Sequence, residues 1–171
     1  MRNEWLVITY YVLWFMADQF KAFIQVLEAL NTYKVDYILI GGVAVILHGR
    51  ERLTRAIDIF VKMVPENIER LRKALYSVFD DPSIEEITLE ELQKYPVIRY
   101  GTPHGFYIDI MARLGEVATY KNLEYEIIDY QGIPIKTGTP ETLFFLKKDT
   151  VRYEDKADAM FLQELIKTRK K

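Results

Sequence analysis

A short apolar run that ends at two glycines limits what this chain can fold into more than any other feature. Residues 35–40 read VDYILI, and a β-branched run of this length bounded by turn residues is typical of a buried strand. Gly41 and Gly42 then allow a tight turn into VAVILH, which predicts a short helix. Backbone N–H groups at such a turn can hold a phosphate group, and a simple tight turn is the alternative interpretation.

The size and composition of the chain favour one globular domain. Its 171 residues are 50% hydrophobic and 28% charged, which suffices for one sizeable core and is too few for two ordinary domains. The absence of cysteine excludes disulfides, thiolate metal sites and a cysteine nucleophile. With only two histidines, a cation bound by oxygen atoms is easier to supply than zinc. The net charge of -2 argues against a protein that coats nucleic acid.

The N-terminal segment is unusually apolar. Its run WLVITYYVLWF is well short of the ~20 residues that a membrane-spanning helix needs, so we expect no membrane span. Helical spacing of apolar residues predicts an amphipathic helix that opens at Met16 with Asp18 as its N-cap. Residues 1–15 are then a leader, an alternative start, a hydrophobic element docked on the domain, or an oligomer-forming helix. We expect a single domain over residues 16–171 and a cytoplasmic location.

Strand and helix patterns along the rest of the chain predict the fold class. We expect an α/β (α+β) domain with a mixed β-sheet flanked by helices. The segments VIRYG and FYIDIM flank the turn TPHG and predict an antiparallel hairpin, and YEIIDY and IPIKT predict another. Thr139 and Pro140 are typical of a helix start, as N-cap and first helical residue. Other helices are expected from Pro65 and over residues 155–168, and a strand over residues 56–61.

Two aspartates lie inside otherwise apolar strand patterns. Asp58 is in AIDIFV and Asp109 is in FYIDIM. Burying two carboxylates costs several kcal/mol unless a cation or hydrogen bonds satisfy them, and a shared metal ion would do so. The alternative is that each aspartate lies at a strand end with its carboxylate in solvent.

The glycine turn and these aspartates resemble the signature of the nucleotidyltransferase superfamily that includes DNA polymerase beta. In that signature a glycine pair opens a short helix, two acids one residue apart follow on a strand, and a third acid lies on a later strand. This chain offers GGVAVILHG, then Arg52, Thr54 and Asp58, and then YIDIM with Asp109. The resemblance implies the nucleotidyltransferase fold with C-terminal helices.

Further details look like one branch of that superfamily, the small bacterial and archaeal members related to abortive-infection-type nucleotidyltransferase toxins. The similarity covers roughly residues 20–165 and includes TPETLFFLKKDTVRYEDKADAMFL near the C-terminus. This branch implies a toxin–antitoxin pair, so a neutralising partner protein, the cognate antitoxin, is expected. The matching positions are His48, Gly49, Arg52, Thr54, Pro140, Glu141, Lys147, Arg152, Asp155 and Asp158.

The chemistry implied by the resemblance depends on carboxylates and divalent metal ions. Three carboxylates hold two Mg²⁺ (or Mn²⁺) ions, which align a nucleoside triphosphate and activate the attacking hydroxyl, and the leaving pyrophosphate lies on the glycine turn. Asp58 and Asp109 are the expected catalytic metal ligands, and Gly41 and Gly42 are the expected phosphate site. Lys147 is expected to neutralise the triphosphate, with a lysine on an exposed helix face as the alternative.

Other residues near the signature are expected to have mainly structural roles. Arg52 and Thr54 belong to the nucleotide site by the resemblance, and their place before the strand suggests that they shape the loop rather than touch substrate. His48 is expected to pack at or cap the end of a helix. Tyr37 and Tyr107 are expected in the core.

Ala56 is the one departure from the signature, because the resemblance predicts the first metal-binding aspartate at this position. A methyl group cannot ligate a cation, and loss of a shared ligand lowers the rate by orders of magnitude. Three explanations stand: an Asp-to-Ala change made to remove activity, a natural inactive relative that still binds nucleotide, or replacement by another acid. Glu51 and Asp149 are poor candidates for that acid.

The resemblance predicts a metal-dependent nucleotidyltransferase that is impaired by Ala56. It would transfer a nucleoside monophosphate from an NTP to a hydroxyl or phosphate of an RNA, a protein or a small molecule, with tRNA as the first acceptor to test. The alternative is a catalytically inactive module of the same fold that binds a nucleotide or a partner. A requirement for a divalent cation in NTP binding would favour the catalytic design.

Overall fold

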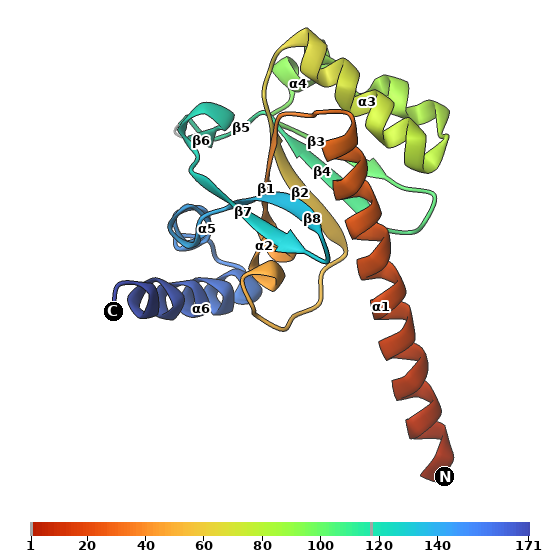
Figure 1. Cartoon of the computed structure of the whole chain (residues 1–171), viewed down its shortest axis with the longest axis vertical. Helices are drawn as coiled ribbons and strands as arrows, with labels where there is room; N and C mark the ends of the chain where they lie inside the picture. The colour runs from red at the N-terminus through yellow and green to blue at the C-terminus, as the bar shows by residue number, and fades with distance from the viewer. Residues whose placement is uncertain (1, 117) are drawn as a thin grey trace.

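The computed structural model describes residues 2–116 and 118–171, and its centre is a six-stranded mixed β-sheet (Figure 1). Antiparallel and parallel neighbours alternate strictly across this sheet, and the two predicted hairpins form its two edges. The predicted mixed sheet is therefore confirmed. In spatial order the strands are β3 (Val97–Gly101), β4 (Tyr107–Met111), β2 (Ala56–Val61), β1 (Tyr37–Ile40), β8 (Ile133–Gly138) and β7 (Tyr125–Tyr130). A separate small sheet contains β5 (Arg113–Leu114) and β6 (Ala118–Thr119).

Helices flank the sheet, as the sequence predicts. Two of them pack against each other along one side, α1 (Arg2–Thr32) and α3 (Pro65–Phe79). Two others pack together at the opposite side in Figure 1, α5 (Pro140–Lys147) and α6 (Tyr153–Arg169). The short helix α2 (Gly41–Leu47) follows β1 directly and contacts both β1 and β2. The remaining helices are α4 (Leu89–Lys94) and two 3-10 helices, Pro82–Glu86 and Tyr120–Asn122.

The hydrophobic core joins the central strands to the C-terminal half of α1. All four residues of β1 are buried, as expected of a nearly continuous apolar strand. Leu27 and Leu30 of α1, and Leu71 and Leu75 of α3, are fully buried at helical spacing. The helices α1 and α3 therefore cover one face of the sheet. The other face of β2 and β4, which carries Asp58 and Asp109, is available for a site.

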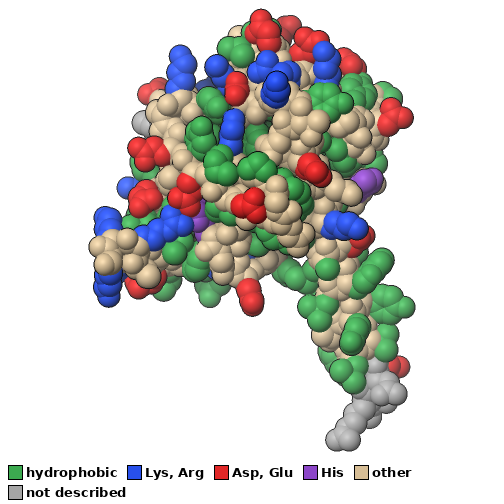
Figure 2. Space-filling view, in the orientation of Figure 1, with side chains coloured by type: hydrophobic (Ala, Val, Ile, Leu, Met, Phe, Trp, Pro, Cys, Tyr) green, Lys and Arg blue, Asp and Glu red, His purple; other side chains and the backbone are tan. Residues whose placement is uncertain are grey.

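The helix α1 begins much earlier than the sequence predicts. One helix runs from Arg2 to Thr32, so Asp18 lies within it and the expected N-cap is wrong. This stretch contains no proline or glycine, and nothing in it therefore ends a helix. Its first half extends away from the body of the molecule, with the side chains of Trp5 and Trp14 exposed by 77% and 67% (Figures 1 and 2). These side chains do not dock on the domain, contrary to one expectation.

Among the described residues, no helix combines the length and apolar character that crossing a membrane requires. Figure 2 shows hydrophobic side chains gathered along the half of α1 that extends from the body of the molecule.

The C-terminal helices form as predicted, with small differences in their bounds. Thr139 is the N-cap of α5, and its side chain accepts a hydrogen bond from Thr142 N. The next residue, Pro140, begins the helix. The last helix begins at Tyr153, two residues before the expected start, with Arg152 as its N-cap. Helix α5 contacts β8 and α2, so it brings its last turn to the edge of the polar face.

Candidate functional site

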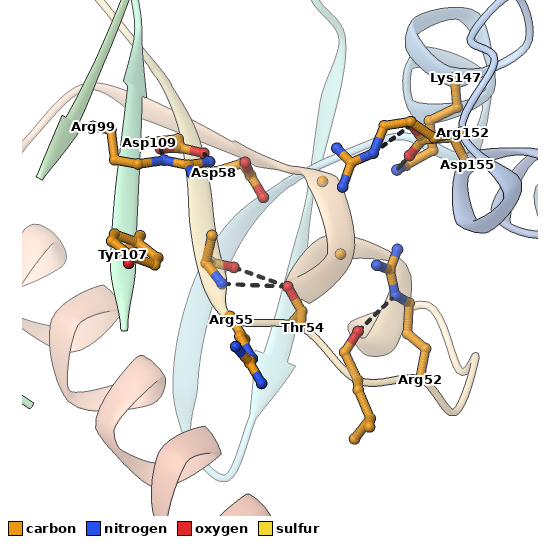
Figure 3. A pocket seen from close by; sticks show the side chains of 14 residues that line it. Arg52, Thr54, Arg55, Asp58, Arg99, Tyr107, Asp109, Lys147, Arg152 and Asp155 are labelled. Carbon is orange, nitrogen blue, oxygen red and sulfur yellow. Dashed lines mark hydrogen bonds and ion pairs between the residues drawn. The ribbon is translucent and has the colours of Figure 1, made fainter. Parts of the chain in front are cut away.

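A polar hollow lies at the junction of β2, β4, α2 and the start of α6. It is a pocket of about 500 Å³, within the size range of small-molecule sites (Figure 3). Its lining includes every residue that the sequence places in the site. Those residues are Gly41, Gly42, Arg52, Thr54, Ala56, Asp58, Asp109 and Lys147.

Asp58 and Asp109 lie side by side in this pocket. They are paired in register across the parallel strands β2 and β4, so their side chains project from the same face of the sheet. Asp109 is buried and Asp58 is partly buried. Burial, and then the charge of Asp109, raises the pKa of Asp58 to about 6, although Lys147 and Arg52 act in the opposite direction. The carboxylates therefore lie at neighbouring strand positions, as a shared cation would require.

The glycine turn is packed directly against this acidic pair. Gly41 has a φ of +69°, and a Cβ atom on it would stand 2.1 Å from Asp58 Oδ2. A Cβ on Gly42 would stand 2.9 Å from Thr54 Oγ1. Glycine at position 41 is therefore required by its backbone conformation and by the approach of the carboxylate. The turn brings the backbone of α2 as close to Asp58 as the chain permits.

Ala56 stands on the same face, two residues before Asp58. It pairs in register with Tyr107, and Thr54 Oγ1 lies 3.2 Å from the Ala56 carbonyl oxygen, to which it donates a hydrogen bond. Thr54 therefore shapes the approach to β2, as expected. Glu51 is exposed and does not line the pocket, which gives no support to its replacing the missing acid. The same is true of Asp149.

The residues of the pocket fit one hard cation rather than two. Among residues 2–116 and 118–171, no group of three or more histidines or acids is arranged to hold a metal ion. Asp58 and Asp109 offer adjacent carboxylate oxygens, which magnesium prefers. The third ligand that a second ion would share is replaced by the methyl group of Ala56.

Arg99 is a residue of the pocket that the sequence interpretation missed. It pairs in register with Asp109 across β3 and β4, and its Nε and Nη2 donate to Oδ1 and Oδ2 of Asp109, each at 2.8 Å. The arginine also lies over the ring of Tyr107, 5.0 Å from its centroid. The pKa of Arg99 is raised by these bonds to Asp109. The predicted hairpin did not give this pairing, because closing it directly across TPHG would set Arg99 opposite Ile108, whereas the observed register sets it opposite Asp109.

Tyr107 is not a core residue, contrary to expectation. Its side chain is 43% exposed and lines the pocket, because the first residue of β4 points to the same face as Asp109. Tyr37 is fully buried, as predicted, and its hydroxyl donates to Asn31 Oδ1 over 3.1 Å. The two tyrosines differ in burial because they belong to opposite faces of the sheet: Tyr37 pairs with Val61, and Tyr107 pairs with Ala56 on the face of Asp58.

Lys147 is held by carboxylates rather than exposed on a helix face. Its Nζ lies 2.7 Å from Asp155 Oδ1 and 2.9 Å from Asp158 Oδ2. The carboxylate of Asp158 is fully buried and also binds Arg50 and Arg52 through ion pairs. This network fastens the loop before β2 to α6. Arg52 therefore has a structural role, and Lys147 reaches the pocket with its charge already paired.

Two further arginines lie at the pocket and add positive charge to it. The side chain of Arg152 is 81% exposed, 3.9 Å from Asp155 Oδ2, and Arg55 is also exposed. Figure 3 shows Arg152 on the α5–α6 side and Arg55 at the entry to β2. The sequence interpretation did not assign Arg55 to the site. An exposed cation before a strand has no pattern that distinguishes it from ordinary surface charge.

His48 has the structural role that the sequence predicts. It is the C-cap of α2, and its Nε2 donates to the carbonyl oxygen of Gly138 over 2.8 Å. Its side chain is fully buried, and burial lowers its pKa. The histidine thus joins the end of α2 to β8 and lies outside the pocket lining.

Comparisons by sequence find no relative: no protein-family model matches the chain, and no curated protein matches it. Solved structures do match its fold. The lincosamide antibiotic adenylyltransferase LnuA, bound to lincomycin, has a TM-score of 0.54 and 18% identity, over 84% of this chain and 95% of that one. An antigenic nucleotidyltransferase-like protein from Paracoccidioides brasiliensis has a TM-score of 0.54 and 17% identity, over 88% and 78% of the two chains.

A third solved structure is also similar in fold. ANT(2″)-Ia in complex with adenylyl-2″-tobramycin has a TM-score of 0.53 and 14% identity, and the match covers 90% of this chain and 92% of that one. Three similar structures therefore carry the nucleotidyltransferase fold over most of their length. The present chain has this fold, as the resemblance of its sequence implies.

Proposed function

We propose that the pocket binds a nucleoside triphosphate and that the chain has the design of a nucleotidyltransferase, impaired by Ala56. The observation that carries this proposal is the placing of Asp58 and Asp109 side by side against the Gly41–Gly42 turn. A carboxylate pair beside a glycine turn offers cation ligands and a backbone site for phosphates in one hollow. The nucleotidyltransferase fold supports the same activity.

Each residue of the pocket has a role in this proposal. Asp58 and Asp109 would hold Mg²⁺ (or Mn²⁺), which when bound supplies positive charge to the phosphates and makes the acceptor hydroxyl more acidic. The backbone N–H groups of Gly41 and Gly42 would bind the phosphates. Lys147 adds charge from the side while remaining bound to its carboxylates. Arg52 and Thr54 hold the loop before β2 in place.

The acceptor is proposed by class. LnuA is named as a lincosamide adenylyltransferase, and the ANT(2″)-Ia complex contains adenylylated tobramycin, so a hydroxyl of a small molecule is one candidate. RNA, with tRNA first, and a protein side chain are the other candidates that follow from the toxin-like sequence features. A cognate antitoxin and a cytoplasmic location belong to the toxin-like proposal, and both depend on it.

The decisive experiment is label transfer from α-labelled NTPs, with Mg²⁺ or Mn²⁺, to total RNA, to protein and to a panel of hydroxylated small molecules. The chain is compared with Ala56→Asp, which restores a carboxylate, and with Ala56→Asn, which matches its size without the charge. We expect transfer by Ala56→Asp to exceed that of the unchanged chain and of Ala56→Asn by orders of magnitude. Equal silence from all three folded proteins would overturn the proposal of an enzyme design.

A second function is favoured by Ala56 itself. Without the third carboxylate, the same pocket is suited to a module that binds a nucleotide and does not transfer it. Calorimetry with nonhydrolysable NTP analogues, with and without a divalent cation, distinguishes the cases. Binding of the NTP analogue, together with no label transfer by Ala56→Asp, would establish the binding module. No binding of the analogue with or without the cation would exclude both functions.

A further inference from the structure

Arg99 differs from an ordinary surface arginine because its guanidinium is held in a fixed orientation in the pocket. Its guanidinium is aligned with both oxygens of Asp109, and its side chain is still 61% exposed on the pocket side. The ring of Tyr107 supports it at 5.0 Å. A two-point alignment with a carboxylate and a stacked ring orients the guanidinium without covering it.

The position of Arg99 is related to the missing aspartate. Ala56 and Tyr107 are paired in register across β2 and β4, and Asp58 and Asp109 are the next pair on the same face. Tyr107 is also the residue under the guanidinium of Arg99. The face that lacks one carboxylate thus holds one additional fixed positive charge beside the two that remain.

The charges of the two arrangements are equal. A site with three carboxylates and two divalent cations carries one net positive charge. Two carboxylates with a single divalent cation and one guanidinium carry the same net charge. Asp109 has room for both partners, because a carboxylate has about four lone-pair sites and a bidentate arginine uses two of them. Two lone-pair sites of Asp109 therefore remain for a cation.

We propose that Arg99 is the resident cation of a one-metal nucleotide site. Its guanidinium, fixed by Asp109 and Tyr107, binds the phosphates of a nucleoside triphosphate directly, and the pocket takes that triphosphate with a single divalent cation on Asp58 and Asp109. This inference rests on the proposed function, since it assumes a triphosphate in the pocket. Arg99 supports nucleotide binding here. It does not replace the aspartate that is missing at position 56 in the transfer step, because a guanidinium cannot hold a cation for the acceptor hydroxyl.

The test counts metal ions and measures nucleotide affinity, so it does not depend on activity. Mn²⁺ is titrated into the full chain with α,β-methylene analogues of the four NTPs, and bound Mn²⁺ is measured by electron paramagnetic resonance. We expect one ion per chain. Arg99→Gln is expected to weaken nucleotide binding by about tenfold or more, the effect of losing a charge-assisted hydrogen bond, while Mn²⁺ alone binds more tightly once its neighbouring charge is gone.

Two further variants make the result specific. Arg70→Gln removes an arginine from a pair with Asp36 outside the pocket and is expected to change neither affinity. Arg99→Lys keeps the charge without the two-point geometry, and nucleotide affinity between those of the unchanged chain and Arg99→Gln is expected. Two Mn²⁺ ions per chain in the unchanged protein, or unaltered affinities in Arg99→Gln, would overturn this inference alone. No nucleotide binding by the unchanged chain would overturn the proposed function with it.

Discussion

Gly41 lies against Asp58 so closely that a Cβ atom on residue 41 would stand 2.1 Å from Asp58 Oδ2. The glycine also has a positive φ of +69°, which other residues rarely adopt. Gly41→Ala is therefore expected to displace the carboxylate and to reduce both the free energy of unfolding and the affinity for NTP. Urea unfolding and calorimetric titration with an NTP analogue measure the two effects.

Gly49 supplies the matched control for that substitution. Its φ is +110°, and a Cβ on it would meet no atom within 4 Å. Gly49→Ala thus carries the backbone strain alone, of about 1–2 kcal/mol, and is expected to leave NTP affinity unchanged. If both variants lose stability and affinity equally, close packing at Asp58 is not the reason for the glycine.

Asp58 is expected to make the stability of the domain depend on pH. Its pKa rises from 3.8 in the unfolded chain to about 6 in the fold, so the folded state binds more protons between these values. Stability from this group is therefore lost as pH rises from 4 to 6, by about 3 kcal/mol in total. Asp58→Asn is expected to be more stable than the unchanged chain at pH 7 and to lose most of that advantage at pH 4.

Urea unfolding at pH 4, 5, 6 and 7 measures this difference. Asp149→Asn, an exposed aspartate away from the pocket, is the control and is expected to follow the unchanged chain. A constant difference between Asp58→Asn and the unchanged chain at every pH would contradict the assignment of a raised pKa to Asp58.

The buried carboxylate of Asp158 is expected to be essential for stability. It binds Arg50, Arg52 and Lys147, whose side chains are all largely buried. Asp158→Asn leaves these cations without their shared partner and is expected to cost about 3–5 kcal/mol. Glu164→Gln, which breaks an exposed pair with Lys167, is the control and is expected to cost less than about 1 kcal/mol. Similar losses of the free energy of unfolding in both variants, measured by chemical unfolding, would mean that the buried network stabilises the fold no more than an exposed ion pair does.

The exposed half of α1 is expected to govern association rather than folding. Its side chains, including Trp5 and Trp14, cover little of the domain, so removal of residues 2–15 should change the free energy of unfolding by less than about 1 kcal/mol. An apolar helix of this kind left in water favours self-association, and the deletion should shift light scattering towards a monomer.

Leu27→Ala tests the other half of the same helix. This residue is fully buried in the hydrophobic core, and the substitution is expected to cost about 2–5 kcal/mol. A comparable loss on removal of residues 2–15 would show that the N-terminal half of α1 also stabilises the domain. An unchanged mass in light scattering after removal of residues 2–15 would exclude a role of the N-terminal half of α1 in association.

The sequence by itself determined the mixed sheet, the glycine turn and the two acidic strands. These are local properties: period-two alternation places Asp58 and Asp109 on a face, glycine marks the turn, and apolar spacing marks the buried half of α1. It also determined that position 56 cannot hold a metal, because a methyl group has no donor atom.

Only the tertiary structure decided which charges meet. Arg52 and Asp158 are 106 residues apart in the sequence, and no local pattern says that a lysine of α5 and two arginines near β2 share one buried carboxylate. The same limit applies to the start of α1, because propensity permits a helix through Asp18 and only packing shows that side chains of its first half, such as Trp5 and Trp14, stay exposed. Periodicity reports the face on which a residue lies, whereas the free energy of burying charge depends on what distant segments place against that face.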